Sequence, residues 1–175
     1  MDLRTANMSS SSQSWTTHSA EETMQVGREL AAMLKALSHL PRAPQMLILR
    51  GDLGAGKTTL VKGIAAGLGA AAESDVTSPT FTLVHEYQRV SESASQRAGK
   101  LYHLDLYRLE KERELDALGI DEMQLGGALV LIEWGEKFPS LVACSDGEIA
   151  IEYAGGDART ITLKQCSGAG STWNT

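Results

Sequence analysis

A glycine-rich loop that ends in a lysine and a threonine is the residue pattern with the clearest chemistry in this chain. Residues 51–58 read GDLGAGKT; they follow an apolar run at residues 46–49, and a helical pattern continues over residues 59–68. Strand, glycine-rich loop and helix in this order are the context of a phosphate-binding P-loop. Glycines let the backbone approach a phosphate closely, and amide N–H groups at the start of a helix favour an anion. The spacing therefore predicts a nucleotide-binding site.

The side chains at the end of this loop have distinct expected roles. Gly54 and Gly56 open the backbone toward the phosphates, and Lys57 brings a mobile positive charge to the β- and γ-phosphates. The Thr58 hydroxyl is a candidate Mg²⁺ ligand, and Thr59 is expected beside the α-phosphate.

Transfer or hydrolysis of a phosphate also needs an acid at the tip of a neighbouring strand. Glu133 follows five apolar residues at 128–132, the pattern of a buried parallel strand that delivers an acid to a Mg²⁺ site. Asp105 also ends a strand pattern, although that strand is more mixed. Both are candidate catalytic residues, and the sequence leaves open which of them orients the attacking water.

Four further side chains are candidates for the same region, and two of them, Thr80 and Trp134, have two interpretations each. Thr80, in the segment Ser78-Pro79-Thr80, is either a sensor of the γ-phosphate or a turn hydroxyl. Trp134 packs over the nucleotide or within the core. His85 and His103 have no second His or Cys at ligand spacing, so we interpret both as structural.

Length and composition indicate a single globular domain. The chain has 175 residues, of which 42% are hydrophobic and 22% charged, with a formal net charge of −6. We expect a cytoplasmic protein, because no signal pattern or membrane-spanning run is evident. The acidic balance and the lack of basic clusters argue against a direct grip on nucleic acid, so any role in an RNA pathway is expected to run through protein partners.

The pattern of apolar residues predicts the elements that position these groups. Residues 1–17 are Ser/Thr-rich and are expected to be a disordered tail, residues 18–165 a single P-loop domain, and residues 166–175 a frayed C-terminal tail. Ser19 with Glu22 fits a capping box, and a helix should run from there to about Leu37.

The remaining predicted elements complete an α/β chain. Strands are expected at residues 81–88 and 101–106 around a polar tip at 91–100, and at 128–132. A short helix is expected at residues 110–118, and a hairpin at the sheet edge is expected from residues 148–153 and 159–163.

Several motifs occur in order along the chain, and together they resemble the motifs of a known protein family. They are GDLGAGKTT at 51–59, SPTFTLV at 78–84, HLDLYRL at 103–109, Glu114-Leu115 with Gly119, and IEW at 132–134. Over roughly residues 19–165 the chain resembles the TsaE family, the bacterial ATPase component of the machinery that makes threonylcarbamoyladenosine in tRNA. The resemblance implies an α/β, P-loop NTPase-like fold with a mostly parallel central sheet flanked by helices and with antiparallel edge hairpins.

The resemblance also implies an activity. It implies a Mg²⁺-dependent ATPase, weak alone, that joins a two-protein complex which transfers threonylcarbamoyl to adenosine 37 of ANN-decoding tRNAs. ATP binding and hydrolysis would reset that complex between turnovers. The residues carried over by position are, as catalytic residues, Lys57, Asp105 and Glu133; as metal ligands, Thr58 and Glu133; and as nucleotide contacts, Ser19 (near the adenine), Gly54, Ala55, Gly56, Lys57, Thr58, Thr59 and Trp134.

Two other functions remain open from the residues. A small P-loop kinase would phosphorylate a metabolite, but such enzymes usually carry an arginine-rich lid, and residues 91–100 hold only Arg97. A non-catalytic adaptor would use ATP only to shape its partner surface. ATP is favoured over GTP, because the chain lacks an Asn-Lys-x-Asp motif and Asp116-x-x-Gly119 falls inside a helical pattern.

Overall fold

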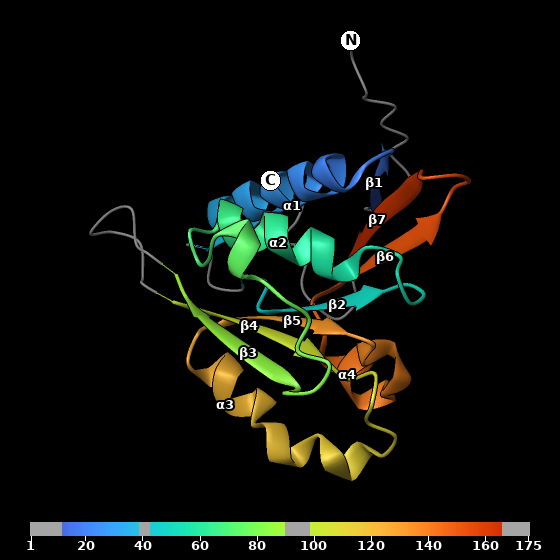
Figure 1. Cartoon of the computed structure of the whole chain (residues 1–175). Helices are drawn as coiled ribbons and strands as arrows, with labels where there is room; N and C mark the ends of the chain where they lie inside the picture. The colour runs from blue at the N-terminus through green and yellow to red at the C-terminus, as the bar shows by residue number, and fades with distance from the viewer. Residues whose placement is uncertain (1–11, 39–42, 90–98, 166–175) are drawn as a thin grey trace.

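The fold is built around one mixed β-sheet. The computed structural model describes residues 12–38, 43–89 and 99–165. Within these ranges, seven strands form the sheet in the order β1-β7-β6-β2-β5-β4-β3 (Figure 1). The strands are β1 (Ser12–Thr17), β2 (Met46–Arg50), β3 (Val84–Gln88), β4 (Lys100–Asp105), β5 (Leu129–Glu133), β6 (Gly147–Tyr153) and β7 (Arg159–Gln165).

Helices lie on both faces of this sheet. The α-helices are α1 (Ala20–Leu37), α2 (Lys57–Gly67), α3 (Ile120–Leu125) and α4 (Pro139–Cys144), and the short 3₁₀ helices are η1 (Glu73–Asp75), η2 (Glu112–Glu114), η3 (Asp116–Leu118) and η4 (Gly135–Lys137). Helices α1 and α2 cover one face, whereas α3 and α4 cover the other (Figure 1). Among the described residues, no helix combines the length and the apolar character that crossing a membrane requires.

The middle of the sheet is parallel and its margins are antiparallel. Strands β6, β2, β5 and β4 pair in parallel. Strand β3 runs antiparallel to β4 at one margin, and β7 and β1 continue the sheet antiparallel at the other. This arrangement confirms the expected α/β fold with a mostly parallel centre, flanking helices and antiparallel hairpins.

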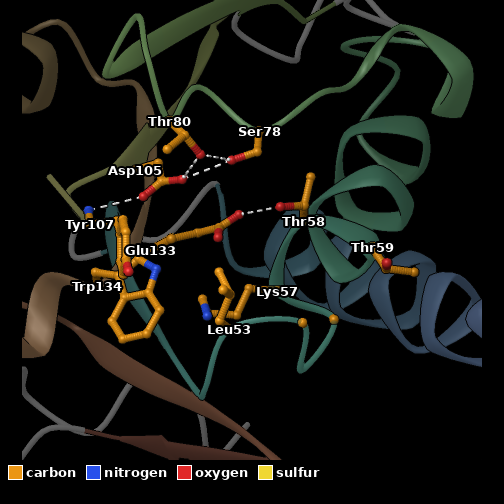
Figure 2. Close-up of a pocket in the computed structure, with 12 residues that line it drawn as sticks. Leu53, Lys57, Thr58, Thr59, Ser78, Thr80, Asp105, Tyr107, Glu133 and Trp134 are labelled. Carbon is orange, nitrogen blue, oxygen red and sulfur yellow. Dashed lines mark hydrogen bonds between the residues drawn. The ribbon is translucent and has the colours of Figure 1, made fainter. Parts of the chain in front are cut away.

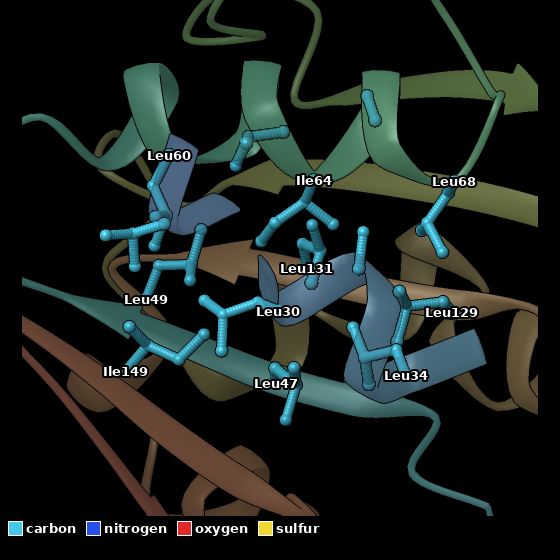
Figure 3. Close-up of a cluster of buried hydrophobic side chains, with 14 of the residues drawn as sticks. Leu30, Leu34, Leu47, Leu49, Leu60, Ile64, Leu68, Leu129, Leu131 and Ile149 are labelled. Carbon is cyan, nitrogen blue, oxygen red and sulfur yellow. The ribbon is translucent and has the colours of Figure 1, made fainter. Parts of the chain in front are cut away.

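The parallel strands are buried on both faces, which explains their unbroken apolar runs. In β2, Leu47 and Leu49 point into the cluster beneath α1 and α2 (Figure 3), while Met46 and Ile48 join the cluster on the opposite face. Residues 129–132 of β5 divide between the two faces in the same way. The period-two alternation is present, but both sets of side chains are apolar.

Helices α1 and α2 approach closely because glycines and alanines lie where they cross. A Cβ added at Gly27 would lie 2.5 Å from the carbonyl oxygen of Leu60, and one at Gly67 would lie 2.6 Å from the Cβ of Ala31. A Cβ at Gly63 would overlap the carbonyl oxygen of Met24. This contact sets α2, and therefore the loop in front of it, against α1.

We predict that Gly63→Ala destabilises the protein by about 1–3 kcal/mol or more, because the added methyl group must push two backbones apart. Urea unfolding followed by circular dichroism measures the free energy of unfolding. Gly126→Ala is the matched control: Gly126 has an ordinary negative φ of −71°, and its Cβ would lie 3.4 Å from the nearest atoms. Equal midpoints for Gly63→Ala and the parent would contradict the close helix contact.

Residues 12–17 correct the predicted boundary of the N-terminal tail. They form β1, which pairs with β7 from Ser12 opposite Lys164 to Thr17 opposite Arg159. Most of its side chains are exposed, so the strand is held mainly by backbone hydrogen bonds. Such a strand needs no alternation of apolar and polar residues, and the sequence shows none. The domain therefore begins before residue 18, and β1 rather than the β6–β7 hairpin forms the edge of the sheet. Residues 1–11 and 166–175, also predicted to be tails, lie outside the described residues.

The predicted helix at residues 110–118 is also corrected. The segment forms η2 and η3 instead, and α3 follows them. The Glu114 carboxylate accepts the backbone N–H groups of Glu110 and Lys111 at 3.0 and 2.8 Å and so caps the start of η2. The strand expected from Phe81 begins at Val84, and most of the tip at 91–100 lies outside the described residues.

Candidate functional site

A pocket of about 380 Å³ lies at the carboxyl ends of β2, β5 and β4, in front of the N-terminus of α2 (Figure 2). In sheets with parallel strands, this edge is where ligands bind. The residues that line the pocket are Leu53, Gly54, Gly56, Lys57, Thr58, Thr59, Ser78, Thr80, Asp105, Tyr107, Glu133 and Trp134.

The glycine-rich loop connects β2 to α2 with a backbone that requires glycine. Gly54 has a φ of 76° and Gly56 a φ of 109°, both in the left-handed region. Gly56 immediately precedes Lys57, the first residue of α2, so the free N–H groups of the helix start face the pocket. The loop thus offers backbone donors to an anion. The Ala55 side chain is buried, and the Ala55 amide bonds to Asp52 O at 3.1 Å.

Lys57 is held beside this loop. Its Nζ donates to the carbonyl oxygens of Gly51 at 2.6 Å and Asp52 at 2.9 Å, and it lies 4.2 Å from the centre of the Trp134 ring. Burial lowers the pKa of the Lys57 ammonium, while nearby carboxylates, Glu133 foremost, oppose that shift. Lys57 is the one basic side chain among the described residues that line the pocket.

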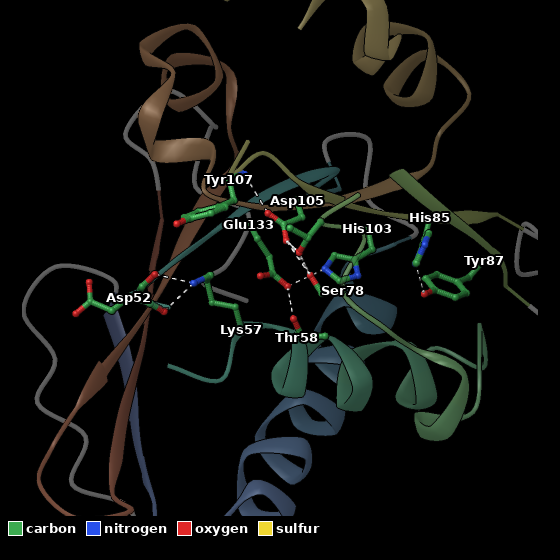
Figure 4. A network of polar contacts seen from close by, with 12 residues as sticks. Asp52, Lys57, Thr58, Ser78, His85, Tyr87, His103, Asp105, Tyr107 and Glu133 are labelled. Carbon is green, nitrogen blue, oxygen red and sulfur yellow. Dashed lines mark hydrogen bonds and ion pairs between the residues drawn. The ribbon is translucent and has the colours of Figure 1, made fainter. Parts of the chain in front are cut away.

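Glu133 ends β5 and bridges three elements. Its Oε1 accepts the Thr58 hydroxyl of α2 at 2.8 Å and lies 2.9 Å from His103 Nε2 of β4 (Figure 4). Glu133 is 4% exposed, so its carboxylate reaches the pocket from within the sheet. The expectation that a buried parallel strand carries this acid to the loop is confirmed by the pairing of β5 with β2 and β4.

Asp105 is the second acid in the pocket. It ends β4, directly opposite Glu133 in the parallel register. Its Oδ2 accepts the hydroxyls of Ser78 at 2.8 Å and Thr80 at 2.6 Å, and its Oδ1 accepts the backbone N–H of Tyr107 at 3.0 Å (Figure 2). Asp105 therefore links the strand to the loop that carries Thr80.

Trp134 closes one side of the pocket. It follows Glu133 with a φ of 63°, which is rare for a residue that is not glycine. This turn directs the indole ring toward Lys57 and toward Tyr107, whose ring centre lies 5.1 Å away. The ring therefore packs on its neighbours and also lines the pocket, and its expected contact with a nucleotide stays a prediction.

The donor set of the pocket fits a Mg²⁺ ion. Thr58 Oγ1 and the Glu133 carboxylate are hard oxygen donors in hydrogen-bond contact. The described residues contain no cluster of three or more His, Cys, Asp or Glu that could hold a metal alone. Magnesium typically uses one or two protein oxygens together with water and substrate phosphates, so these two residues suffice as the protein's share.

The structure brings most of the predicted site residues together. Lys57, Thr58, Asp105, Glu133 and Trp134 line one pocket, and their individual roles stay predictions. Thr59 also lines it but points away from the two acids (Figure 2).

Ser19 does not line this pocket, and its expected contact with adenine stays a prediction. Its Oγ instead caps α1 by accepting the N–H of Glu22 at 3.1 Å. The Glu22 carboxylate completes the predicted cap in a slightly different way, because it accepts the N–H of His18 at 2.7 Å.

Sequence reasoning missed three contributors to the pocket and its surroundings. Ser78 and Tyr107 both contact Asp105, and His103 contacts Glu133. The available signal for His103 was its position two residues before Asp105, which puts both side chains on the same face of one strand.

Fold and site together define a mixed α/β protein with a phosphate-suited pocket at the carboxyl edge of its parallel strands. The sequence model of the family described as "Threonylcarbamoyl adenosine biosynthesis protein TsaE" matches residues 17–161. The chain belongs to this family, and the resemblance drawn from its motifs is confirmed.

Individual relatives agree with the family match. The chain is 39% identical over 149 residues to the tRNA threonylcarbamoyladenosine biosynthesis protein TsaE of Bacillus subtilis (strain 168), covering 85% of this chain and 83% of that protein. It is 41% identical over 141 residues to the protein of the same name from Haemophilus influenzae, covering 80% and 81%. The crystal structure of Bacillus subtilis YdiB superposes with a TM-score of 0.58 at 30% identity, covering 95% of this chain and 94% of that one.

Proposed function

We propose that this chain is the ATP-binding and ATP-hydrolysing component of the machinery that makes N6-threonylcarbamoyladenosine at adenosine 37 of tRNA. In this role a cytoplasmic protein hydrolyses ATP slowly by itself and resets the two-protein transferase complex between turnovers. Family membership supports the pathway. The observation that best supports ATP hydrolysis is that a glycine-rich loop, a lysine and two carboxylates on adjacent parallel strands line one pocket.

The loop and Lys57 account for binding of the triphosphate. The free N–H groups around Gly54 and Gly56 receive phosphate oxygens. Lys57 Nζ exchanges the carbonyl oxygens of Gly51 and Asp52 for the β- and γ-phosphates and neutralises charge that develops on them during hydrolysis. The Trp134 ring, 4.2 Å from Lys57 Nζ, keeps the ammonium on the pocket side of the loop.

The positions of the two acids suggest a different role in hydrolysis for each of them. Glu133 contacts the Thr58 hydroxyl and is therefore the acid on the metal side. A Mg²⁺ ion held there would draw negative charge off the β- and γ-phosphates. Asp105 lies one strand further from the loop and contacts the Thr80 hydroxyl, so we assign it the orientation of the attacking water. Thr80 then reports the γ-phosphate to the segment around it.

Partner proteins are expected to accelerate the reaction. Because Lys57 is the one basic side chain among the described residues of the pocket, a further positive charge near the γ-phosphate has to come from elsewhere. An arginine supplied in trans can raise such a rate by roughly 10³–10⁵-fold. Weak activity alone and stimulation by the transferase complex follow from the same pocket.

The test is the rate of phosphate release from ATP with Mg²⁺, measured with and without the purified two-protein transferase complex. We expect slow release alone and release at least about tenfold faster with the complex. The same mixture with Lys57→Ala in place of the parent corrects for ATPase activity of the partners. A rate that does not respond to the partners would count against the proposed role.

A further inference from the structure

His103 lies directly behind Glu133 and is fully buried. It precedes Asp105 by two residues on the same face of β4. It therefore lies further from the carboxyl edge of the sheet, and it does not line the pocket. We propose that His103 is a positioning residue: its Nε2–H fixes Glu133 Oε1, so that Oε2 stays the oxygen available to a metal ion or its water. This inference rests on the proposed function, because it concerns the metal-side acid of that pocket.

The surroundings of the imidazole place its proton. Nε2 lies 2.9 Å from Glu133 Oε1, whereas Nδ1 is buried and has no hydrogen-bond partner among the described residues. A proton on Nδ1 would leave a buried N–H without an acceptor and would set the Nε2 lone pair against the carboxylate oxygen. The proton therefore belongs on Nε2, and the histidine donates to Glu133.

Two donors on a single oxygen fix the orientation of the Glu133 carboxylate. Oε1 accepts His103 Nε2–H at 2.9 Å and the Thr58 hydroxyl at 2.8 Å, from β4 and α2 respectively (Figure 4). The terminal torsion of a glutamate is otherwise broad, and its two oxygens exchange places readily. With Oε1 held from both sides, exchange would break two hydrogen bonds at once.

The same contacts orient the Thr58 hydroxyl. Because its proton is given to Glu133, its lone pairs are left for a cation in the pocket. His103 thus acts on both metal-side groups through one carboxylate, as a residue behind a metal ligand commonly does. Its full burial explains why it does so without touching substrate.

Two substitutions separate positioning from simple packing. His103→Gln keeps an N–H donor at about the depth of Nε2, whereas His103→Leu fills similar space without a donor. A packing role would be served by leucine at least as well as by glutamine. His85→Leu is the matched control, because His85 pairs with His103 in the register of β3 and β4 but contacts Tyr87 instead of an acid of the pocket.

The binding experiment is calorimetric titration of ATP into the full chain, once with EDTA and once with Mg²⁺. We expect His103→Leu to weaken the Mg²⁺-dependent gain in affinity by roughly tenfold or more. Its affinity in EDTA should stay within about twofold of the parent, and His103→Gln and His85→Leu should keep the gain. Equal Mg²⁺-dependent gains in His103→Leu and the parent would overturn the proposal.

A second measurement needs neither nucleotide nor metal. Long-range ¹H–¹⁵N correlation spectra of the free parent report the tautomer of each histidine, and the signal missing in His103→Gln identifies His103. We expect a protonated Nε2 and an unprotonated Nδ1, and the opposite tautomer would refute the proposal even if His103→Leu fails to fold. A parent that binds no ATP at all would instead refute the proposed function, so the two failures are distinguishable.

Discussion

Replacing Lys57 with alanine is expected to lower the rate of ATP hydrolysis in the partner-stimulated reaction by roughly 10²–10³-fold or more. The reason is that Lys57 carries the positive charge nearest to the glycine-rich loop and is the one basic side chain among the described residues of the pocket. Water compensates poorly for the loss of a preorganised charge that faces the transferred phosphate, because Lys57 is a largely buried residue. Phosphate release at saturating ATP and Mg²⁺ measures the effect.

The fold of the Lys57 variant has to be checked, because the ammonium also holds two loop carbonyls. Lys57→Met is a second variant that keeps an unbranched side chain of similar length beside Trp134 and removes the charged group. Lys164→Ala serves as the control for loss of one positive charge at an exposed position in β7. If Lys57→Met unfolds at the same temperature as the parent and hydrolyses ATP equally fast, the assignment of the pocket to ATP hydrolysis is wrong.

The parts of the fold that the sequence predicts well are those whose side chains determine the backbone. The glycines of residues 51–58 adopt conformations that other residues avoid, so their spacing specifies the loop. The apolar run at 128–132 can be buried on both faces only inside a parallel sheet, and β5 lies there. The helix at the N-terminus is likewise marked by its cap at Ser19 and by a buried stripe that reaches Leu37.

The parts that were mispredicted are held by backbone contacts or by chain-distant partners. Strand β1 consists mainly of exposed polar side chains and exists because β7 offers it an open edge, a condition that lies about 145 residues away along the chain. The segment at 110–118 has the charge pattern of a helix, but Glu112 accepts the Ser140 hydroxyl of α4 at 2.6 Å, a partner 28 residues further along the chain. Neither feature is encoded in a local apolar period.

The candidate site shows the same division. Residues that belong to recognisable motifs, such as Thr58 and Trp134, can be predicted to line the pocket because their neighbours in sequence are informative. His103 was interpreted as structural, since a lone histidine has no ligand spacing. Its relation to Glu133 depends on the parallel pairing of β4 with β5, which sets Asp105 opposite Glu133 and leaves His103 Nε2 2.9 Å from the Glu133 carboxylate.

Asp105→Asn is expected to lower ATP hydrolysis by roughly 10²–10⁴-fold while leaving ATP affinity nearly unchanged, since the acid acts on the attacking water and not on the nucleotide. Asparagine is isosteric, its oxygen can still accept the N–H of Tyr107, and the hydroxyls of Ser78 and Thr80 can rotate to face its amide. The loop around Thr80 should therefore stay in place, and the loss should appear in kcat with little change in KM. Single-turnover phosphate release and calorimetric binding of ATP separate the two quantities.

The matched control for Asp105→Asn is Asp116→Asn, an exposed acid in η3 whose loss should change neither quantity. Glu133→Gln extends the test, because it removes the metal-side acid and should slow hydrolysis as well. A third readout, threonylcarbamoyladenosine formed on tRNA by the complete set of proteins, decides between the two remaining mechanisms. If Asp105→Asn and Glu133→Gln hydrolyse ATP as fast as the parent, neither acid serves hydrolysis. If they lose hydrolysis but support modification as well as the parent does, the nucleotide only shapes the surface that partners recognise. If both variants lose hydrolysis and modification together, the reset of the complex requires cleavage of ATP.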